Sequence, residues 1–403
     1  MRAKVSSQAG YLARIGEIFN RPALFWLLIA LAVRLLAGTV LHLYSEAQGF
    51  AGFYPLASGS DDRIYWSQAQ SLLVGTIPPG IVCPYPYVLS GLFAIFGPSL
   101  ILGKLLSIVA GSLAVYVGVL AASALAAHRP YSWRDLRHPA NLAGLLLTLY
   151  PSAVFHSTVL LRDSLILFFG LLGIYYGLRI LEDKGNTLVW PGYFLALTLL
   201  YDFRPYAGFV LSLSFVLYQL FLRQRAIALL AGLFVAMAAP WLAGFGPFAW
   251  QYVNNFINPQ TVATFREDVY NIGGSAIGVT VDFSSISGFL LTYPYSFLTA
   301  MFGPFLWQVR SQVIAIGLLE ALPVLFLLPE WVKGIWRVLR RQEGREGFLL
   351  LFSLALIGAI ALFSGNIGAN LRLRLLPWSA FLIFAAVQFG GRLQKSSGQS
   401  GRK

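Results

Sequence analysis

Long apolar stretches separated by short polar segments run through most of the chain. They include residues 22–43, 100–127, 142–159 and 348–363. Each is close to the roughly 20 residues that a helix needs to cross the hydrocarbon core of a bilayer. Backbone groups find no water partners there, so a spanning segment satisfies them best as a helix. The pattern predicts an all-α, polytopic membrane helical bundle with about ten transmembrane helices.

The whole chain, 1–403, is expected to form a single membrane domain with two long outer segments, 45–99 and 244–310. The apolar stretch 289–305 contains Pro294, Gly303 and Pro304, and we interpret it as an interfacial helix on the outer leaflet, because a further span there would place the basic residues that follow it outside. The expected spans are about 22–43, 100–127, 140–159, 164–181, 188–201, 206–222, 226–243, 311–328, 347–364 and 375–391.

Composition and charge agree with this layout. Hydrophobic residues make up 57% of the chain and charged residues 11%, whereas a soluble domain carries roughly 25% charge. Lys and Arg gather in the segments that these spans place on one side, which predicts cytoplasmic N- and C-termini in a plasma (inner) membrane. The net charge of +13 is then a topology signal, and no nucleic-acid partner is expected. The single cysteine, Cys83, excludes an intrachain disulfide.

The few charges on the outer side are the candidates for chemistry. Asp61 and Asp62 follow the first span; they either begin a short helix that runs to Leu73, with Ser60 or Asp61 as its cap, or supply a general base at the membrane surface. Arg162 and Asp163 lie between spans three and four, as a local ion pair or helix cap or as a phosphate or substrate contact.

Two further outer turns carry charged residues. Asp202 and Arg204 precede Pro205, either as a satisfied turn pair or as part of an outer cavity shared with the preceding turn. Asn366, Asn370, Arg372 and Arg374 lie between the last two spans. Arginine suits bidentate recognition of phosphate, and an anchor to anionic lipid is the alternative.

Weaker candidates lie elsewhere in the sequence. Glu267 belongs to a charged loop that is either solvated or touches substrate. Arg34 and Glu320 lie within spans, where they are functional or pair with each other. Tyr85 and Tyr87 either stack on sugar or sit at the membrane interface. The four histidines show no metal-ligand spacing; no cofactor is predicted with certainty, and a divalent metal stays possible.

Four groups of positions in the first 220 or so residues form a pattern. They are Asp61-Asp62 with Tyr65, Ala69 and Gly75, Tyr85-Pro86-Tyr87 through Phe96-Gly97-Pro98-Ser99, Tyr150-Pro151 through Arg162-Asp163, and Arg204-Pro205. In this pattern the chain resembles the GT-C membrane glycosyltransferases, in particular the protein-mannosyltransferase-like group that includes the bacterial lipid A aminoarabinose transferases. It departs from them in that an Asp stands where the second acid is commonly Glu, and in that Cys83-Pro84-Tyr85-Pro86 replaces the Lys-Pro-Pro-like element.

This resemblance implies an inverting transfer of a sugar from a polyprenyl-phosphate-linked donor to a glycan, lipid or protein acceptor at the outer face of the bilayer. It implies that Asp61 is the base and that Asp62 orients Asp61 or the acceptor. Fixed cations would stabilise the leaving phosphate: Arg204, Arg372, Arg374, Arg162 and Lys104. Substrate contacts would come from Asp163, Tyr85, Tyr87, Arg63, Asn366, Asn370 and Glu267.

Two other functions fit the same features. An O-antigen or exopolysaccharide polymerase or ligase also has many spans, outer loops and outer arginines. A transporter or flippase for a lipid-linked sugar would carry charges near the midplane of the bilayer, which only Arg34 and Glu320 suggest. The position of the acidic pair directly after the first span favours the transferase.

Overall fold

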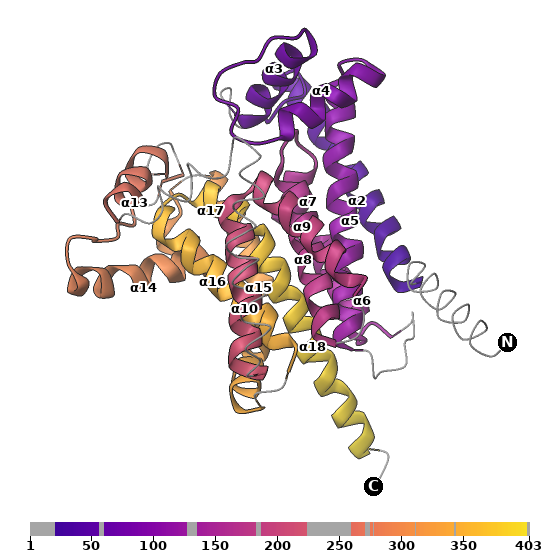
Figure 1. Ribbon diagram of the computed structural model, residues 1–403, viewed down its shortest axis with the longest axis vertical. Coiled ribbons are helices and arrows are strands. Elements are labelled where there is room, and N and C mark those ends of the chain that lie inside the picture. Colours follow the sequence, from indigo (N-terminus) through magenta and orange to yellow (C-terminus); the bar gives the residue numbers. More distant parts are fainter. Residues whose placement is uncertain are drawn as a thin grey trace, which may run out of the picture.

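The computed structural model describes residues 21–55, 60–126, 135–182, 187–223, 259–270, 275–276, 278–310, 312–341 and 344–400. Within these ranges the protein is a helical bundle (Figure 1). The bundle contains α2 (Arg21–Ala47), α5 (Leu100–Leu125), α6 (Pro139–Leu149), α8 (Asp163–Glu182), α9 (Val189–Phe203), α10 (Pro205–Arg223), α15 (Gln312–Arg341), α16 (Glu346–Phe363) and α18 (Leu375–Ser400). The prediction of an all-α membrane bundle is confirmed.

The spans differ in how regular they are. Among the described residues, α2, α5, α8 and α16 are each long and apolar enough to cross a membrane, and a fifth span results if α17 (Ile367–Leu373) and α18, bent by 56°, count as one. The predicted fifth span corresponds to α9, of 15 residues, and the predicted sixth and eighth spans correspond to parts of α10 and α15. The predicted seventh span, 226–243, lies outside the described residues.

The predicted third span, about 140–159, is not one continuous helix. Residues 139–159 form α6 and a separate helix α7 (Pro151–Ser157). Pro151 has no N–H and crowds the residue before it, so Tyr150 adopts an extended conformation with ψ 109°. The break leaves α7 as a short helix that leads directly to Arg162 and Asp163.

Helix α5 lies at the centre of the first half of the bundle and contacts α2, α6 and α8. Small residues permit the close approach. A Cβ atom on Gly111 would lie 2.8 Å from the Cβ of Ser157 and 3.1 Å from the Nε of Arg34. This packing fixes α7, and with it the beginning of α8, against the bundle.

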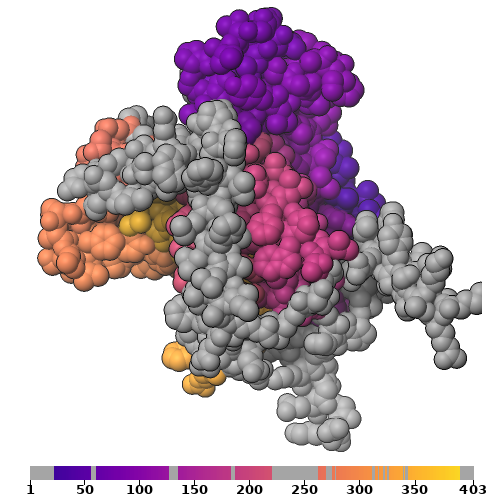
Figure 2. Space-filling view, in the orientation of Figure 1, coloured from indigo at the N-terminus to yellow at the C-terminus, as the bar shows by residue number. Residues whose placement is uncertain are grey.

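The first outer segment folds as a cap at one end of the bundle (Figure 2). It contains α3 (Asp61–Leu73) and α4 (Tyr85–Phe96), which pack on each other. The predicted helix that runs to Leu73 is therefore confirmed. The first residue of α2 and the end of α18 lie away from this cap (Figure 1).

The described part of the second outer segment packs beside α16. It contains α13 (Pro259–Phe265), the π-helical turn Arg266–Tyr270, α14 (Ile286–Phe302) and a 3₁₀ turn, Leu306–Gln308. Helix α14 runs across the direction of the bundle (Figure 1), and its Tyr293 hydroxyl donates to the Gly358 carbonyl at 2.9 Å. This transverse course is compatible with an interfacial helix, which stays a prediction.

Candidate active site

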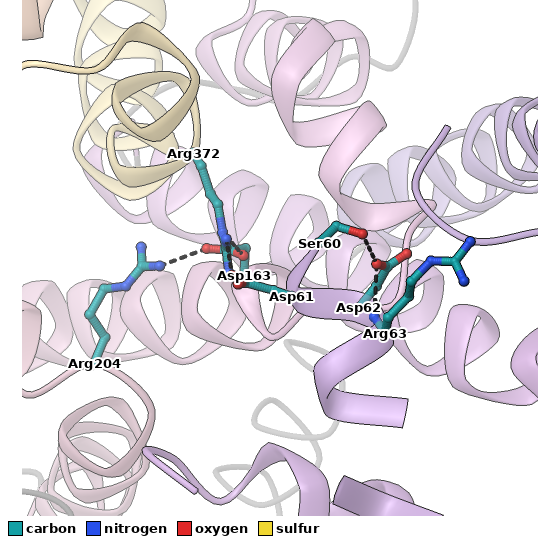
Figure 3. Close-up of polar contacts among 7 residues, drawn as sticks. All are labelled: Ser60, Asp61, Asp62, Arg63, Asp163, Arg204 and Arg372. Carbon is teal, nitrogen blue, oxygen red and sulfur yellow. Dashed lines mark hydrogen bonds and ion pairs between the residues drawn. The ribbon is translucent and has the colours of Figure 1, made fainter. Parts of the chain in front are cut away.

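The neighbouring acids Asp61 and Asp62 point in different directions from the first turn of α3 (Figure 3). Consecutive residues of a helix are separated by about 100°. The Asp61 side chain is 44% exposed and pairs with Arg372. The Asp62 side chain is buried and accepts hydrogen bonds from the backbone N–H of Tyr54 at 2.5 Å, from the Ser60 hydroxyl, and from the backbone N–H of Arg63 at 2.9 Å.

These contacts give the two acids different tasks. Asp62 satisfies several donors of the loop before α3 and so fixes where that helix begins. Ser60 occupies the N-cap position, but its hydroxyl bonds to Asp62 instead of to a helix N–H. Asp61 is left facing the basic side chains of the bundle (Figure 3).

Asp163 lies between two arginines that are remote in the sequence. Its Oδ1 accepts from Arg204 Nη2 at 2.6 Å, and its Oδ2 accepts from Arg372 Nε at 2.5 Å. Because Arg372 also contacts Asp61, the four side chains form a continuous row (Figure 3). The row joins α3, the start of α8, the α9–α10 turn and α17.

The Asp163 and Arg204 side chains of the row are removed from water. The Asp163 side chain is 0% exposed, and that of Arg204 is 6% exposed. A buried carboxylate is tolerated only where charges and hydrogen bonds compensate its lost hydration. Two guanidiniums supply this compensation, so Asp163 can hold both arginines in fixed positions.

Arg162 adds a third guanidinium beside this row. It interacts electrostatically with Tyr65 and Asp163, and its Nε is buried with no hydrogen-bond partner. Three guanidiniums against the carboxylates of Asp61 and Asp163 leave one positive charge in excess. The excess positive charge suits binding of an anionic ligand. The half-exposed carboxylate of Asp61 lies beside it, where it could act on a reacting group of that ligand.

Tyrosines from the cap cover the network. Tyr65 and Tyr85 are buried and pack edge to face at 5.1 Å. Burial raises the pKa of the Tyr65 hydroxyl and of the Tyr85 hydroxyl above the usual value, so both stay neutral donors at ordinary pH. The hydroxyls of Tyr85 and Ser107 lie 3.3 Å apart, whereas the Tyr87 side chain is 43% exposed.

Two of the basic residues predicted for phosphate binding lie outside the row. Lys104 is buried in α5 and donates to the Gly52 carbonyl at 2.5 Å, with His42 Nδ1 at 3.3 Å. Arg374 is buried and pairs with Glu320 at 2.9 Å. The alternative in which Glu320 pairs with Arg34 is therefore wrong.

The structure also places the remaining predicted substrate contacts. Arg63 donates to the Phe50 carbonyl at 3.0 Å. Asn366 caps α17 and accepts from the Ser275 hydroxyl at 2.8 Å, and Asn370 is buried in the same helix. Glu267 is exposed. Arg63, Asn370 and Glu267 do not contact the Asp163 row through a side-chain hydrogen bond within the described residues.

Sequence reasoning missed His156 of α7. Its side chain is buried and interacts electrostatically with Asp163, Arg372 and Arg204. The signal in the sequence that points to it is its position seven residues before Asp163. Across the described ranges, no three His, Cys, Asp or Glu side chains are grouped so as to hold a metal ion.

The fold is similar to that of a polytopic helical membrane protein of known structure. No protein-family model and no characterised protein sequence matches the chain. Among solved structures it is similar to ArnT from Cupriavidus metallidurans bound to undecaprenyl phosphate, with a TM-score of 0.53 and 14% identity over 91% of this chain and 59% of that one. The same protein in the apo state gives a TM-score of 0.51 and 16% identity over 82% and 55%. The chain thus spans just under three fifths of ArnT.

Proposed function

We propose that the protein is an inverting glycosyltransferase that moves a sugar from a polyprenyl-phosphate-linked donor to a hydroxyl of a glycan, lipid or protein acceptor at the outer face of the plasma membrane. One observation carries the proposal: the Asp61–Arg372–Asp163–Arg204 row places a half-exposed carboxylate beside fixed guanidiniums. The GT-C fold supports it, since the neighbour ArnT was solved with undecaprenyl phosphate bound.

Asp61 is the base in this proposal. The acceptor oxygen attacks the anomeric carbon of the sugar while Asp61 takes the proton of the acceptor hydroxyl. The bond from the anomeric carbon to the phosphate oxygen breaks in the same displacement, so the configuration inverts. Asp61 is suited to the task because its carboxylate is 44% exposed, whereas Asp62 is occupied by three donors.

The leaving group carries the bonding electrons away as a polyprenyl phosphate. Its developing negative charge needs cations that are already in place. Arg372, Arg204 and Arg162 have this role in our proposal, and Asp163 holds the first two at fixed positions. We do not extend the role to Lys104 or Arg374, since both are engaged with other groups.

The contact between Arg372 and Asp61 suggests an order of binding. The guanidinium of Arg372 occupies an oxygen of the Asp61 carboxylate that an acceptor hydroxyl would have to reach. A donor phosphate that draws Arg372 toward itself would free Asp61 for the acceptor. Donor binding should therefore precede acceptor binding.

The test uses the purified full-length protein in proteoliposomes that contain undecaprenyl-phosphate-linked sugars and candidate acceptors. Asp61→Asn should reduce transfer at least about 100-fold, as loss of a general base does, while folding and insertion stay intact. Asp202→Asn is a matched control, because Asp202 is a carboxylate near the end of α9, two residues before Arg204, and forms none of the ion pairs of the row. Retained transfer in Asp61→Asn would overturn the assignment of the base.

The products separate this proposal from the two alternatives. A single sugar added per acceptor supports the transferase. A ladder of repeating units would identify a polymerase. Movement of a labelled lipid-linked sugar across the bilayer without any acceptor would identify a flippase.

A further inference from the structure

Two basic residues point in opposite directions at the end of α17: Arg372 lies in its last turn, and Arg374 is its C-cap residue. Arg372 faces the Asp163 row, and Arg374 faces the interior of the bundle. Residues two apart on a helix are separated by about 200°, and the backbone N–H of Arg374 still donates to the Asn370 carbonyl at 3.0 Å. The position of Arg374 therefore sets the rotation of the helix that carries Arg372.

Arg374 is held by three different contacts. Its side chain is 1% exposed, and Nη2 lies 2.9 Å from Glu320 Oε2. Nη1 donates to the Gly303 carbonyl at 2.5 Å, and the guanidinium lies 4.4 Å from the centre of the Trp378 ring. A planar guanidinium with this many partners has one orientation available.

Glu320 connects Arg374 to the segment that precedes Asp163. Its Oε1 accepts from the backbone N–H of Ser152 at 2.6 Å, at the beginning of α7. Helix α7 leads within a few residues to Asp163, the ion-pair partner of Arg372. One buried carboxylate thus binds both the segment before Asp163 and the segment that carries Arg372.

The other end of α17 is fixed separately. The backbone N–H of Ile367 donates to the Ser275 carbonyl at 3.0 Å, and the Ser275 hydroxyl donates to Asn366 Oδ1 at 2.8 Å. Helix α17 has seven residues, too short to keep its position by itself. Its placement depends on these contacts at its two ends.

A buried ion pair is weak evidence for a gain in stability, because the cost of desolvation is large, and its best-attested use is to fix one arrangement. We propose that Arg374 and Glu320 are positioning residues that set the place of Arg372 beside Asp163. This inference rests on the proposed function in one respect, namely that the ligand of Arg372 is the donor phosphate. In this view Arg374 does not contact the phosphate and acts only by positioning Arg372.

The first test measures α17 itself and needs no substrate. Glu320→Gln removes the charge with little change in shape. Hydrogen exchange of the full-length protein in nanodiscs should then speed up about tenfold or more at residues 367–374, with α8 unchanged. Glu330→Gln is the matched control, since Glu330 is a buried carboxylate of the same helix that pairs with Lys333 and lies about 15 Å further along it.

Unchanged exchange at residues 367–374 in Glu320→Gln would overturn the proposal. If that variant does not fold, Arg374→Lys replaces it, because lysine keeps the charge and loses the planar fork. In that case faster exchange at α17 supports the proposal, and exchange equal to that of the unaltered protein refutes it.

The second test is a double-mutant cycle on the affinity for undecaprenyl phosphate, measured by native mass spectrometry. Glu320→Gln alone should weaken binding about tenfold, and should add little in an Arg372→Ala background, because residues that act through one another are not additive. Fully additive effects would show that the pair does not act through Arg372. If the unaltered protein binds no undecaprenyl phosphate, the proposed donor is wrong. The hydrogen-exchange experiment alone then decides whether Arg374 and Glu320 position α17.

Discussion

Asp163→Asn tests the ion network most directly. The carboxylate is fully buried and bridges Arg204 at 2.6 Å and Arg372 at 2.5 Å. Asparagine has nearly the same shape but no charge, and only its carbonyl oxygen can accept a hydrogen bond. Its amide group would face one of the two guanidiniums, donor against donor, and two cations would remain close together without the anion between them.

The size of the effect follows from burial. Removal of one partner of a buried ion pair costs about 3–5 kcal/mol. The Arg204 side chain is 6% exposed and that of Arg372 is 21% exposed, so water screens part of the penalty at Arg372. We expect a loss of about 3 kcal/mol in the free energy of unfolding, near the lower end of that range.

The free energy of unfolding can be measured in lipid bicelles by steric trapping. Asp202→Asn is the control and should change it by less than about 1 kcal/mol. Transfer by Asp163→Asn, measured where it is still folded, should fall about 100-fold, since displaced cations no longer match the leaving phosphate. A loss of stability below about 1 kcal/mol would refute the conclusion that Asp163 holds the two arginines.

Two further predictions concern the outer segments. Asp62→Ala should cost about 3 kcal/mol locally, because it leaves buried donors without their charged acceptor; limited proteolysis within residues 45–99 should become faster, and unchanged cleavage would contradict the role given to Asp62. Arg266→Met should loosen the second outer segment, since Arg266 donates to the Ala361 and Val279 carbonyls at 2.8 and 2.7 Å. Hydrogen exchange over residues 278–302 checks this prediction, and equal protection in both proteins would exclude it.

The class of fold could be predicted from hydropathy because the bilayer imposes one solution on long apolar segments. The short helix from Asp61 to Leu73 was also predictable from its position and its polar beginning. The positions at which the spans are interrupted were less predictable. Pro151 divides the predicted third span, whereas Pro323 and Pro329 lie inside α15 without ending it, so a proline alone does not determine where a transmembrane helix breaks.

For the charged residues, too, part of the picture follows from the sequence and part does not. The sequence by itself predicted that Asp61, Asp163, Arg204 and Arg372 lie near one membrane surface, because charges follow topology and apolar spans leave few places for them. It could not show that Asp62 turns into the loop while Asp61 faces the arginines. Adjacent residues are almost indistinguishable by their position in the sequence, yet on a helix they point about 100° apart.

Only the tertiary structure decided which charges meet. Asp163 and Arg372 are 209 residues apart, and Arg374, two residues further on, pairs with Glu320 instead. No local pattern encodes such pairings, since they depend on how α17 is rotated and on where the break at Pro151 directs α7. Burial then makes each pairing strongly specific, because a charge inside the bundle must find its partner or lose its hydration without compensation.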